Sequence, residues 1–169
     1  MTLREGINEQ MIKIAADPMA LFIGQQCGDQ DFYGTLKGIP DNQRMEFPVA
    51  EEMQMGMAIG LAIKGFRVVC IYQRVDFLMR AMDQLVNHVD LMDEYSRGKF
   101  QANIMIRSTI GSHYPLNVGL QHNKDLIQLL KASVSFPVYE VIDPVMYSMA
   151  PKNSPVMFIE RQDDYDQEV

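Results

Sequence analysis

Segments with helical spacing of apolar residues alternate along the chain with short, continuous apolar runs. In residues 3–16, apolar side chains recur every third or fourth position, which is the spacing of an amphipathic helix. These positions are Leu3, Ile7, Met11, Ile14 and Ala15. Asp17-Pro18 ends the helical pattern, and residues 20–24 are a short continuous apolar run, as expected for a buried strand. The sequence therefore predicts a helix followed by a strand.

The same alternation predicts the remaining elements. Further strands are expected at residues 66–72, 102–107, 138–142 and 156–159, and residues 45–48 are either a short strand or an extended entry to the next helix. Helices are expected at residues 50–64, 76–92 and 124–132, with a helical stretch at residues 144–149. Polar segments that contain glycine predict loops at residues 28–42 and 111–121.

Strands that alternate with helices predict an α/β fold, a three-layer sandwich with a central, mostly parallel sheet and helices on both faces. We expect residues 1–169 to form a single domain with a short acidic tail at about residues 161–169. A solvated end beyond the last strand is the simpler interpretation of that tail, and a docking segment is the alternative. Because such a sheet binds ligands at the carboxyl ends of its strands, we expect the site in the loops after Gly24, Pro48, Gln73 and Arg107.

Composition narrows the classes of function. A net charge of −7 argues against nucleic acid as a partner, because phosphates require a basic surface. No apolar run approaches the length of a membrane span, and the N-terminus lacks the apolar core of a signal peptide. Cys27 and Cys70 match no metal-binding spacing, so we interpret both as reduced residues of a cytoplasmic protein.

The segment from Pro48 to Gly60 combines an acidic helix start with two glycines one turn apart. Glu51 and Glu52 open the predicted helix, where the helix dipole favours negative charge. Gly56 and Gly60 would allow a neighbouring element to approach the helix closely. Taken alone, this pattern is more often a structural helix start than a site.

The following segment changes that interpretation. The strand at residues 66–72 is followed by Phe77 and then by Asp83-Gln84 in a helix. Together with Pro48, Glu51, Gly56 and Gly60, this order resembles the transketolase-like pyrimidine-binding domain of thiamine-diphosphate enzymes. The resemblance is closest to the β chain of the 2-oxo acid dehydrogenase first component, and deoxyxylulose-phosphate synthase shows a similar order.

The resemblance implies a role for five residues. Glu51 matches the catalytic glutamate that hydrogen-bonds the thiamine aminopyrimidine, and Phe77 matches the aromatic residue packed on the pyrimidine. Val49 and Gln73 match residues beside the cofactor, and His122 matches an active-site histidine near the substrate. A core phenylalanine and a surface histidine at the start of a helix are the structural alternatives for Phe77 and His122.

Three departures from the family bear on the expected reaction and assembly. Gln25-Gln26 stands where β chains of this family have acidic residues, which puts the standard dehydrogenase reaction in doubt. The Gly-Asp-Gly motif with a later Asn, which holds Mg²⁺ and diphosphate, is absent, so the sequence offers no metal ligands of its own. The family's β chain continues into another domain, whereas this sequence ends at Val169.

These features predict one subunit of a split enzyme that uses thiamine diphosphate and Mg²⁺. A diphosphate-binding, α-like subunit would supply the Mg²⁺ ligands, and we expect the two chains to form an α2β2 hetero-oligomer. The small-molecule substrate would be a 2-oxo acid or a ketose. We also expect the partner to cover exposed apolar residues of the loops, namely Phe32, Tyr33, Phe77, Met79 and Tyr114.

Two other functions compete with this interpretation. A non-catalytic module that keeps the fold for assembly or regulation is favoured by Gln25 and by the missing second domain, and disfavoured by Glu51, Phe77 and His122. A small nucleotide-binding α/β protein is disfavoured because the sequence has no glycine-rich phosphate loop.

Overall fold

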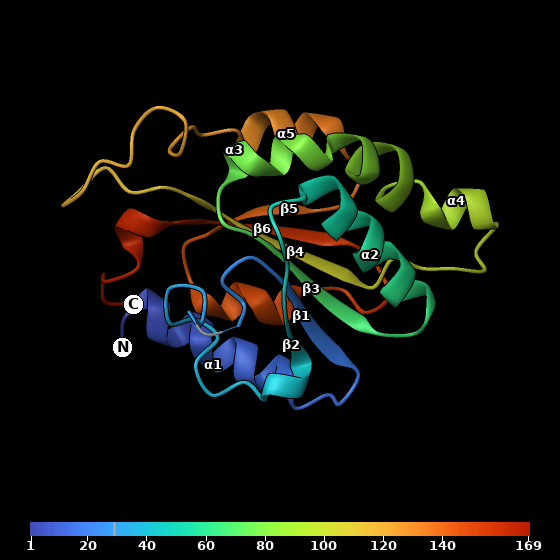
Figure 1. Ribbon diagram of the computed structural model, residues 1–169, viewed down its shortest axis with the longest axis horizontal. Coiled ribbons are helices and arrows are strands. Elements are labelled where there is room, and N and C mark those ends of the chain that lie inside the picture. The colour runs from blue at the N-terminus through green and yellow to red at the C-terminus, as the bar shows by residue number, and fades with distance from the viewer. Residues whose placement is uncertain (29) are drawn as a thin grey trace.

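The strands form one six-stranded sheet in which every neighbouring pair is parallel. The computed structural model describes residues 1–28 and 30–169. The strand order is β2-β1-β3-β4-β6-β5, and Figure 1 shows the sheet in the middle of the molecule. The strands are β1 (Ala20–Gly24), β2 (Arg44–Glu46), β3 (Arg67–Tyr72), β4 (Ile104–Ile110), β5 (Val138–Val141) and β6 (Val156–Arg161). The α/β class expected from the sequence is confirmed.

Helices cover both faces of the sheet, as the alternating pattern predicts. The long helices are α1 (Leu3–Ala15) and α2 (Glu51–Ile63), and the shorter ones are α3 (Val75–Leu78), α4 (Met92–Ser96) and α5 (Ile127–Ser133). Helix α1 and the 3-10 segment Pro144–Met149 lie on one face, and α2, α3 and α5 lie on the other (Figure 1). The described chain is therefore a three-layer sandwich.

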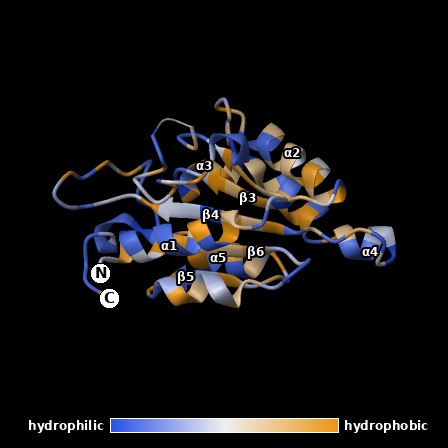
Figure 2. Ribbon diagram, turned by 90° about the horizontal axis from the view of Figure 1, so that it is seen from below, coloured by the Kyte–Doolittle hydropathy of each residue, from blue (hydrophilic) through white to orange (hydrophobic). Residues whose placement is uncertain are grey.

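Successive residues of the central strands pack into two separate hydrophobic cores, one on each face of the sheet. On β3, Val69 and Ile71 pack with α1, whereas Val68 and Cys70 pack with α2. Side chains alternate between the faces of a strand, so a strand buried on both faces is apolar throughout. Figure 2 shows hydrophobic residues concentrated along the central strands β3 and β4.

The helix predicted for residues 76–92 is irregular. It begins as α3, tightens to a 3-10 turn at Met79–Ala81, widens to a π-helical turn at Gln84–Val89, and is followed by α4. The chain keeps right-handed helical dihedral angles at Met79, Met82 and Asp83. The prediction of one regular helix is wrong. Apolar spacing shows which residues face the sheet, but it does not show whether the backbone hydrogen bonds follow the 3-10, α or π pattern.

Strand β4 runs further than the sequence pattern indicates. It continues through Ser108, Thr109 and Ile110, three residues beyond the predicted end at residue 107. Ser108 and Thr109 are buried, and their polarity ended the apolar pattern early. Arg107 therefore lies inside the strand and not in the loop after it, so the expectation that it marks the site is wrong.

The acidic end of the chain packs against the N-terminus instead of extending freely into solvent. Tyr165 is buried, and the Arg4 N–H donates to its carbonyl at 3.0 Å. Thr2 and Glu168 form an isolated antiparallel bridge, and the two termini lie side by side in Figures 1 and 2. None of the helices in the described residues is long and apolar enough to cross a membrane.

Candidate active site

A broad pocket of about 1230 Å³ lies at the carboxyl ends of β1 and β3. Its walls come from three separated parts of the chain: the residue after β1, the first three turns of α2 with the extended segment before it, and the segment after β3. Because the strands are parallel, their carboxyl ends meet at this edge, and the following loops surround one space. The site thus lies where the sheet topology places ligands.

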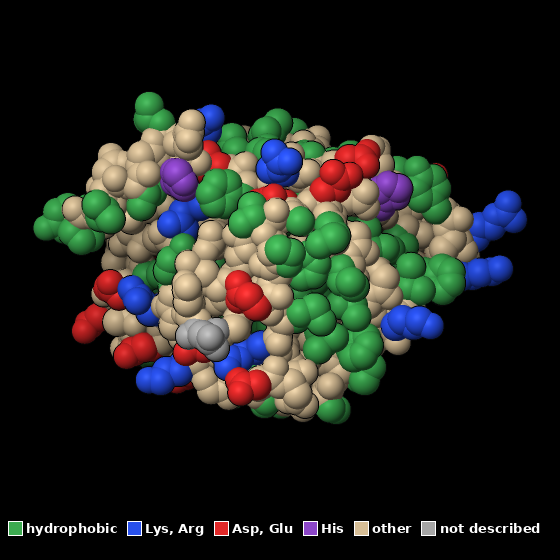
Figure 3. Space-filling model, in the orientation of Figure 1, with side chains coloured by type: hydrophobic (Ala, Val, Ile, Leu, Met, Phe, Trp, Pro, Cys, Tyr) green, Lys and Arg blue, Asp and Glu red, His purple; other side chains and the backbone are tan. Residues whose placement is uncertain are grey.

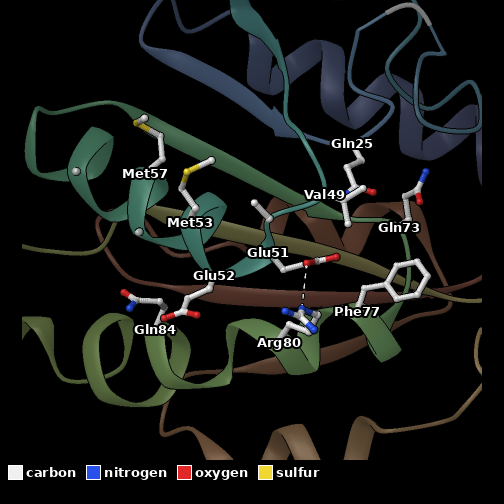
Figure 4. Close-up of a pocket in the computed structure, with 13 residues that line it drawn as sticks. Gln25, Val49, Glu51, Glu52, Met53, Met57, Gln73, Phe77, Arg80 and Gln84 are labelled. Atoms are coloured by element: carbon white, nitrogen blue, oxygen red, sulfur yellow. Dashed lines mark ion pairs between the residues drawn. The ribbon is translucent and has the colours of Figure 1, made fainter.

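Glu51 is the first residue of α2 and has a side chain that is only 4% exposed. Its carboxylate points into the pocket, as Figure 4 shows. The Tyr72 hydroxyl donates to the Glu51 backbone carbonyl at 3.0 Å and fixes the start of the helix to the end of β3. The helix dipole favours a carboxylate at this position. A negative charge is therefore held at the inner wall of the pocket.

Arg80 faces Glu51 across the pocket. Its Nε lies 3.6 Å from Glu51 Oε2, and its own side chain is 78% exposed (Figure 4). The resemblance to a family did not indicate this residue. A local signal existed, however, because Arg80 follows Phe77 by three positions, which is about one helical turn.

Phe77 lines the pocket and contacts His122. The two rings lie 5.4 Å apart, edge to face, with an interplanar angle of 86°. His122 itself lies beside the pocket on the loop after β4, where its carbonyl accepts a hydrogen bond from Gly111 N at 3.0 Å. The structure therefore brings His122 next to the pocket through Phe77.

Val49 and Gln73 complete the set of residues singled out by sequence. Both line the pocket, Val49 from the exposed segment before α2 and Gln73 from the end of β3. Gln25, which replaces an acidic residue of the family pattern, lies beside them in Figure 4. The structure thus places Val49, Glu51, Gln73 and Phe77 in one pocket, with His122 at its edge.

The rest of the pocket wall is mostly neutral and partly apolar, with the exposed Glu52 as the one further charged residue among the described residues that line it. Met53, Met57, Gly56 and Gly60 come from the outer side of α2, and Gln84 comes from the π-helical turn. A flat aromatic ring with a hydrogen-bonding edge suits this combination, since Phe77 and the methionines offer apolar contact and Glu51 offers an acceptor. Among residues 1–28 and 30–169, no group of three His, Cys, Asp or Glu side chains could hold a metal ion.

Arg107 belongs to a buried network away from the pocket. Its Nε and Nη2 lie 2.8 and 3.0 Å from the two carboxylate oxygens of Glu160, which also accepts from the hydroxyls of Tyr147 and Tyr165. Burial alone would lower the pKa of Arg107, but the Glu160 carboxylate raises it above its ordinary value. Burial raises the pKa of both tyrosines.

Phe32 is part of this network and not of the exposed patch expected from the sequence. Its ring is fully buried, with the Arg107 guanidinium 5.3 Å from the ring centre. The prediction that a partner covers Phe32 is therefore wrong. Tyr114 is exposed, and Tyr33, Phe77 and Met79 are half-buried.

Comparison with known proteins gives one family and several relatives. The family described as "Transketolase, pyrimidine binding domain" matches residues 1–118. The β-2 subunit of the mitochondrial pyruvate dehydrogenase E1 component of Oryza sativa subsp. japonica is 29% identical over 130 residues, covering 73% of this chain and 34% of the rice protein. The corresponding β subunit of Gracilaria tenuistipitata var. liui is 29% identical over 168 residues, covering 94% of this chain and 50% of that protein.

Two solved structures share the fold. A split-gene transketolase, described as an inactive β4 tetramer, superposes with a TM-score of 0.70 at 17% identity, covering 96% of this chain and 51% of that one. The transketolase of Campylobacter jejuni subsp. jejuni superposes with a TM-score of 0.71 at 15% identity, covering 94% and 25%. The chain thus spans about half the length of these relatives, or less.

Proposed function

Because the chain belongs to the family of transketolase pyrimidine-binding domains, we propose that it is the pyrimidine-binding subunit of a split thiamine-diphosphate-dependent enzyme. The substrate is a 2-oxo acid or a ketose, and the reaction is decarboxylation or transfer of a two-carbon or acyl unit. The proposal is supported by the similarity of the chain to a pyruvate dehydrogenase β subunit and to a split-gene transketolase.

The observation that carries the proposal is the buried carboxylate of Glu51 opposite an aromatic wall. Glu51 would hydrogen-bond a ring nitrogen of the aminopyrimidine and hold a proton there, in a pocket that Phe77 lines. Val49 and Gln73 also line the pocket and would lie beside the ring. When bound, thiamine diphosphate supplies the nucleophilic carbon that attacks the substrate carbonyl.

His122 acts later than Glu51 in this proposal. Its ring contacts Phe77, which lines the pocket, and it lies on the loop after β4. An imidazole there can donate a proton to the bound substrate or accept one from it. We therefore assign His122 to substrate protonation and Glu51 to the cofactor.

A partner subunit supplies the diphosphate and Mg²⁺ site. The sequence contains no Gly-Asp-Gly motif, and Met53 and Met57 of α2 are exposed where they line the pocket. Figure 3 shows hydrophobic side chains gathered over α2. We propose an α2β2 hetero-oligomer in which an α-like, diphosphate-binding chain covers this side. A cytoplasmic location stays a prediction; it is supported by the buried free thiols of Cys27 and Cys70.

Substitution of the two adjacent glutamates tests the catalytic assignment. In the complex with its co-purified partner, Glu51→Gln should slow deuterium exchange at the thiazolium C2 of thiamine diphosphate about 100-fold or more, because the amide cannot share the proton. Glu52→Gln is the matched control and should have little effect, since Glu52 is exposed. Equal losses in both variants, or a loss in Glu52→Gln alone, would show that the wrong carboxylate was chosen.

A non-catalytic assembly module is the second candidate. Gln25 lines the pocket where the family pattern has an acidic residue, and Arg80 already pairs with Glu51. This alternative predicts a complex that assembles normally but shows no C2 exchange with either the unmodified chain or Glu52→Gln. The same exchange measurement therefore separates the two functions.

A further inference from the structure

Arg74 is a buried guanidinium at the carboxyl edge of the sheet. It directly follows Gln73, just beyond β3, and is 9% exposed. Its Nη1 donates to the Gln73 carbonyl at 2.8 Å, to Thr109 Oγ1 at 3.1 Å and to the Tyr33 hydroxyl. The guanidinium carbon also lies 5.4 Å from the centre of the Tyr33 ring.

Every one of these partners is neutral. In the described part of the chain, Arg74 forms no ion pair with a carboxylate within 4 Å, and its Nε is buried without a hydrogen-bond partner. The other buried arginine behaves differently, because both carboxylate oxygens of Glu160 face Arg107. Burying a charge without a counter-charge is unfavourable, so Arg74 lies at a position that an anion from outside the chain would stabilise.

Arg74 also lies under the loop that carries His122. A Cβ placed on Gly111 would come within 2.9 Å of Arg74 Nε and 2.2 Å of the His122 carbonyl oxygen. Only glycine allows the loop to pack this closely over the guanidinium. Gln73, next to Arg74, lines the pocket, and the His122 ring contacts Phe77. Arg74 thus stands beside the pocket on the side assigned to the substrate.

We propose that Arg74 binds the anionic group of the substrate, either the carboxylate of a 2-oxo acid or the phosphate of a phosphorylated sugar. The guanidinium can donate a charge-assisted hydrogen bond to such a group, and Tyr33 and Thr109 hold it in orientation. The inference rests on the proposed function, because it takes the substrate to bind in this pocket. A carboxylate side chain of the partner subunit is the competing occupant.

Anion titration of the isolated full chain tests the site without thiamine diphosphate. Pyruvate, inorganic phosphate and neutral hydroxyacetone are added separately to the ¹⁵N-labelled chain, and the Arg74 Nε–H signal is followed by NMR. Pyruvate or phosphate should shift the signal, and whichever binds more tightly identifies the anion; hydroxyacetone should not. Arg74→Met should abolish the pyruvate- or phosphate-induced shifts of the neighbouring amides of Thr109 and Gly111. Arg97→Met, which removes an exposed arginine at the end of α4, should leave them unchanged.

Kinetics of the complex with its partner provide the second readout. Arg74→Met should raise KM for the anionic substrate about 10- to 100-fold, with a smaller effect on kcat. Arg74→Lys, which keeps the charge but not the planar fork, should fall between Arg74→Met and the unmodified chain and also serves if Arg74→Met does not fold. C2 deuterium exchange should remain normal in both variants.

The outcomes separate this inference from the proposed function. If neither anion shifts the Arg74 signal, substrate recognition by Arg74 is wrong. If Arg74→Met loses partner binding while its anion response is unchanged, it is wrong as well, and a carboxylate of the partner is the occupant. If anions shift the signal but the complex shows no C2 exchange, the anion site stands and the proposed enzyme function fails.

Discussion

Glu51 and Glu52 are adjacent in the chain but occupy different environments. Both line the pocket, but successive residues of a helix point about 100° apart, so the two side chains leave the helix in different directions. Glu51 is buried against the end of β3, whereas Glu52 is exposed near Gln84 (Figure 4). The position on the helix, and not the residue type, therefore decides which of the two carboxyl groups is buried.

Arg80 competes with a ligand for Glu51. The ion pair joins an exposed guanidinium to a buried carboxylate at 3.6 Å, so it contributes little to the free energy of unfolding. A ligand that binds the Glu51 carboxylate has to displace the Arg80 side chain or share the carboxylate with it. We expect Arg80→Gln to leave the melting temperature nearly unchanged and to tighten thiamine diphosphate binding by the complex up to about fivefold. Calorimetry measures both quantities.

The control for this experiment is Arg97→Gln, which removes the same charge from the distant end of α4. It should change neither quantity. Weaker cofactor binding in Arg80→Gln would contradict the prediction and would show that Arg80 binds the cofactor together with Glu51.

Sequence alone indicates some residues of the site and misses others for a physical reason. Glu51 and Phe77 lie in ordered motifs along the chain, so a resemblance finds them. The partners of Arg74 are distant in sequence: Tyr33 lies 41 residues away and Thr109 lies 35 residues away. An uncompensated buried charge becomes visible only when folding brings such segments together.

At the scale of elements, apolar spacing predicts where each segment runs but not how it ends. Strand β1 begins and ends where the pattern predicts. Strand β4 ends later than the pattern predicts, because its last part contains Ser108 and Thr109, which are polar although they are buried. Helix α5 begins at Ile127, three residues after its predicted start, and the Asp125 carboxylate just before it accepts from Ile127 N at 3.1 Å.

The loop after β4 is anchored by Asp163 of the C-terminal segment. Asp163 Oδ1 accepts from the backbone N–H groups of His113 and Tyr114 at 2.9 and 3.3 Å. Burial alone would raise the pKa of Asp163, but these hydrogen bonds lower it below its ordinary value. Because the folded-state pKa is lowered, the stabilisation is complete above the unfolded pKa of about 3.9 and is lost as the pH falls through the folded value.

We therefore expect the loop to stay anchored down to about pH 4 and to be released only under more acidic conditions. Hydrogen exchange of the His113 and Tyr114 amides measures the release. Asp163→Ala should make both amides exchange rapidly already at neutral pH, whereas Asp164→Ala, one residue along, should not. Release of the loop near neutral pH in the unmodified chain would contradict the assignment of the anchor to Asp163.

At the scale of the whole molecule, the Arg107–Glu160 pair joins distant parts of the chain. Arg107 lies on β4, Glu160 on β6 and Tyr165 in the C-terminal segment, and Thr35 Oγ1 accepts from Arg107 Nη2 at 3.1 Å. Removing one member of such a buried pair typically costs about 3–5 kcal/mol, because the other charge remains buried. The sequence did not predict this network, since an acidic chain end gives no sign of which carboxylate turns inward.

Helix α2 leaves an apolar surface uncovered on the side of the pocket. Met53, Met57 and Ile63 are exposed on it, and Figure 3 shows hydrophobic side chains gathered over this helix. A helix that is apolar on its outer face as well as its inner face is expected to be buried in the working assembly. Among the described residues, a Cβ on Gly60 would meet no atom within 4 Å, so this part of the helix is open to close approach by the partner.

A charge on this surface should prevent assembly without unfolding the chain. Met57 on α2 and Ile12 on α1 have nearly equal exposure, 45% and 46%, but lie on opposite faces of the sheet. We expect Met57→Glu to abolish the complex in light scattering with the co-expressed partner, because an unpaired charge would be buried at the interface. Ile12→Glu should assemble normally, and both variants should melt close to the unmodified chain. If Met57→Glu assembles as well as Ile12→Glu, the partner does not cover this part of α2, and the interface with it lies on another face.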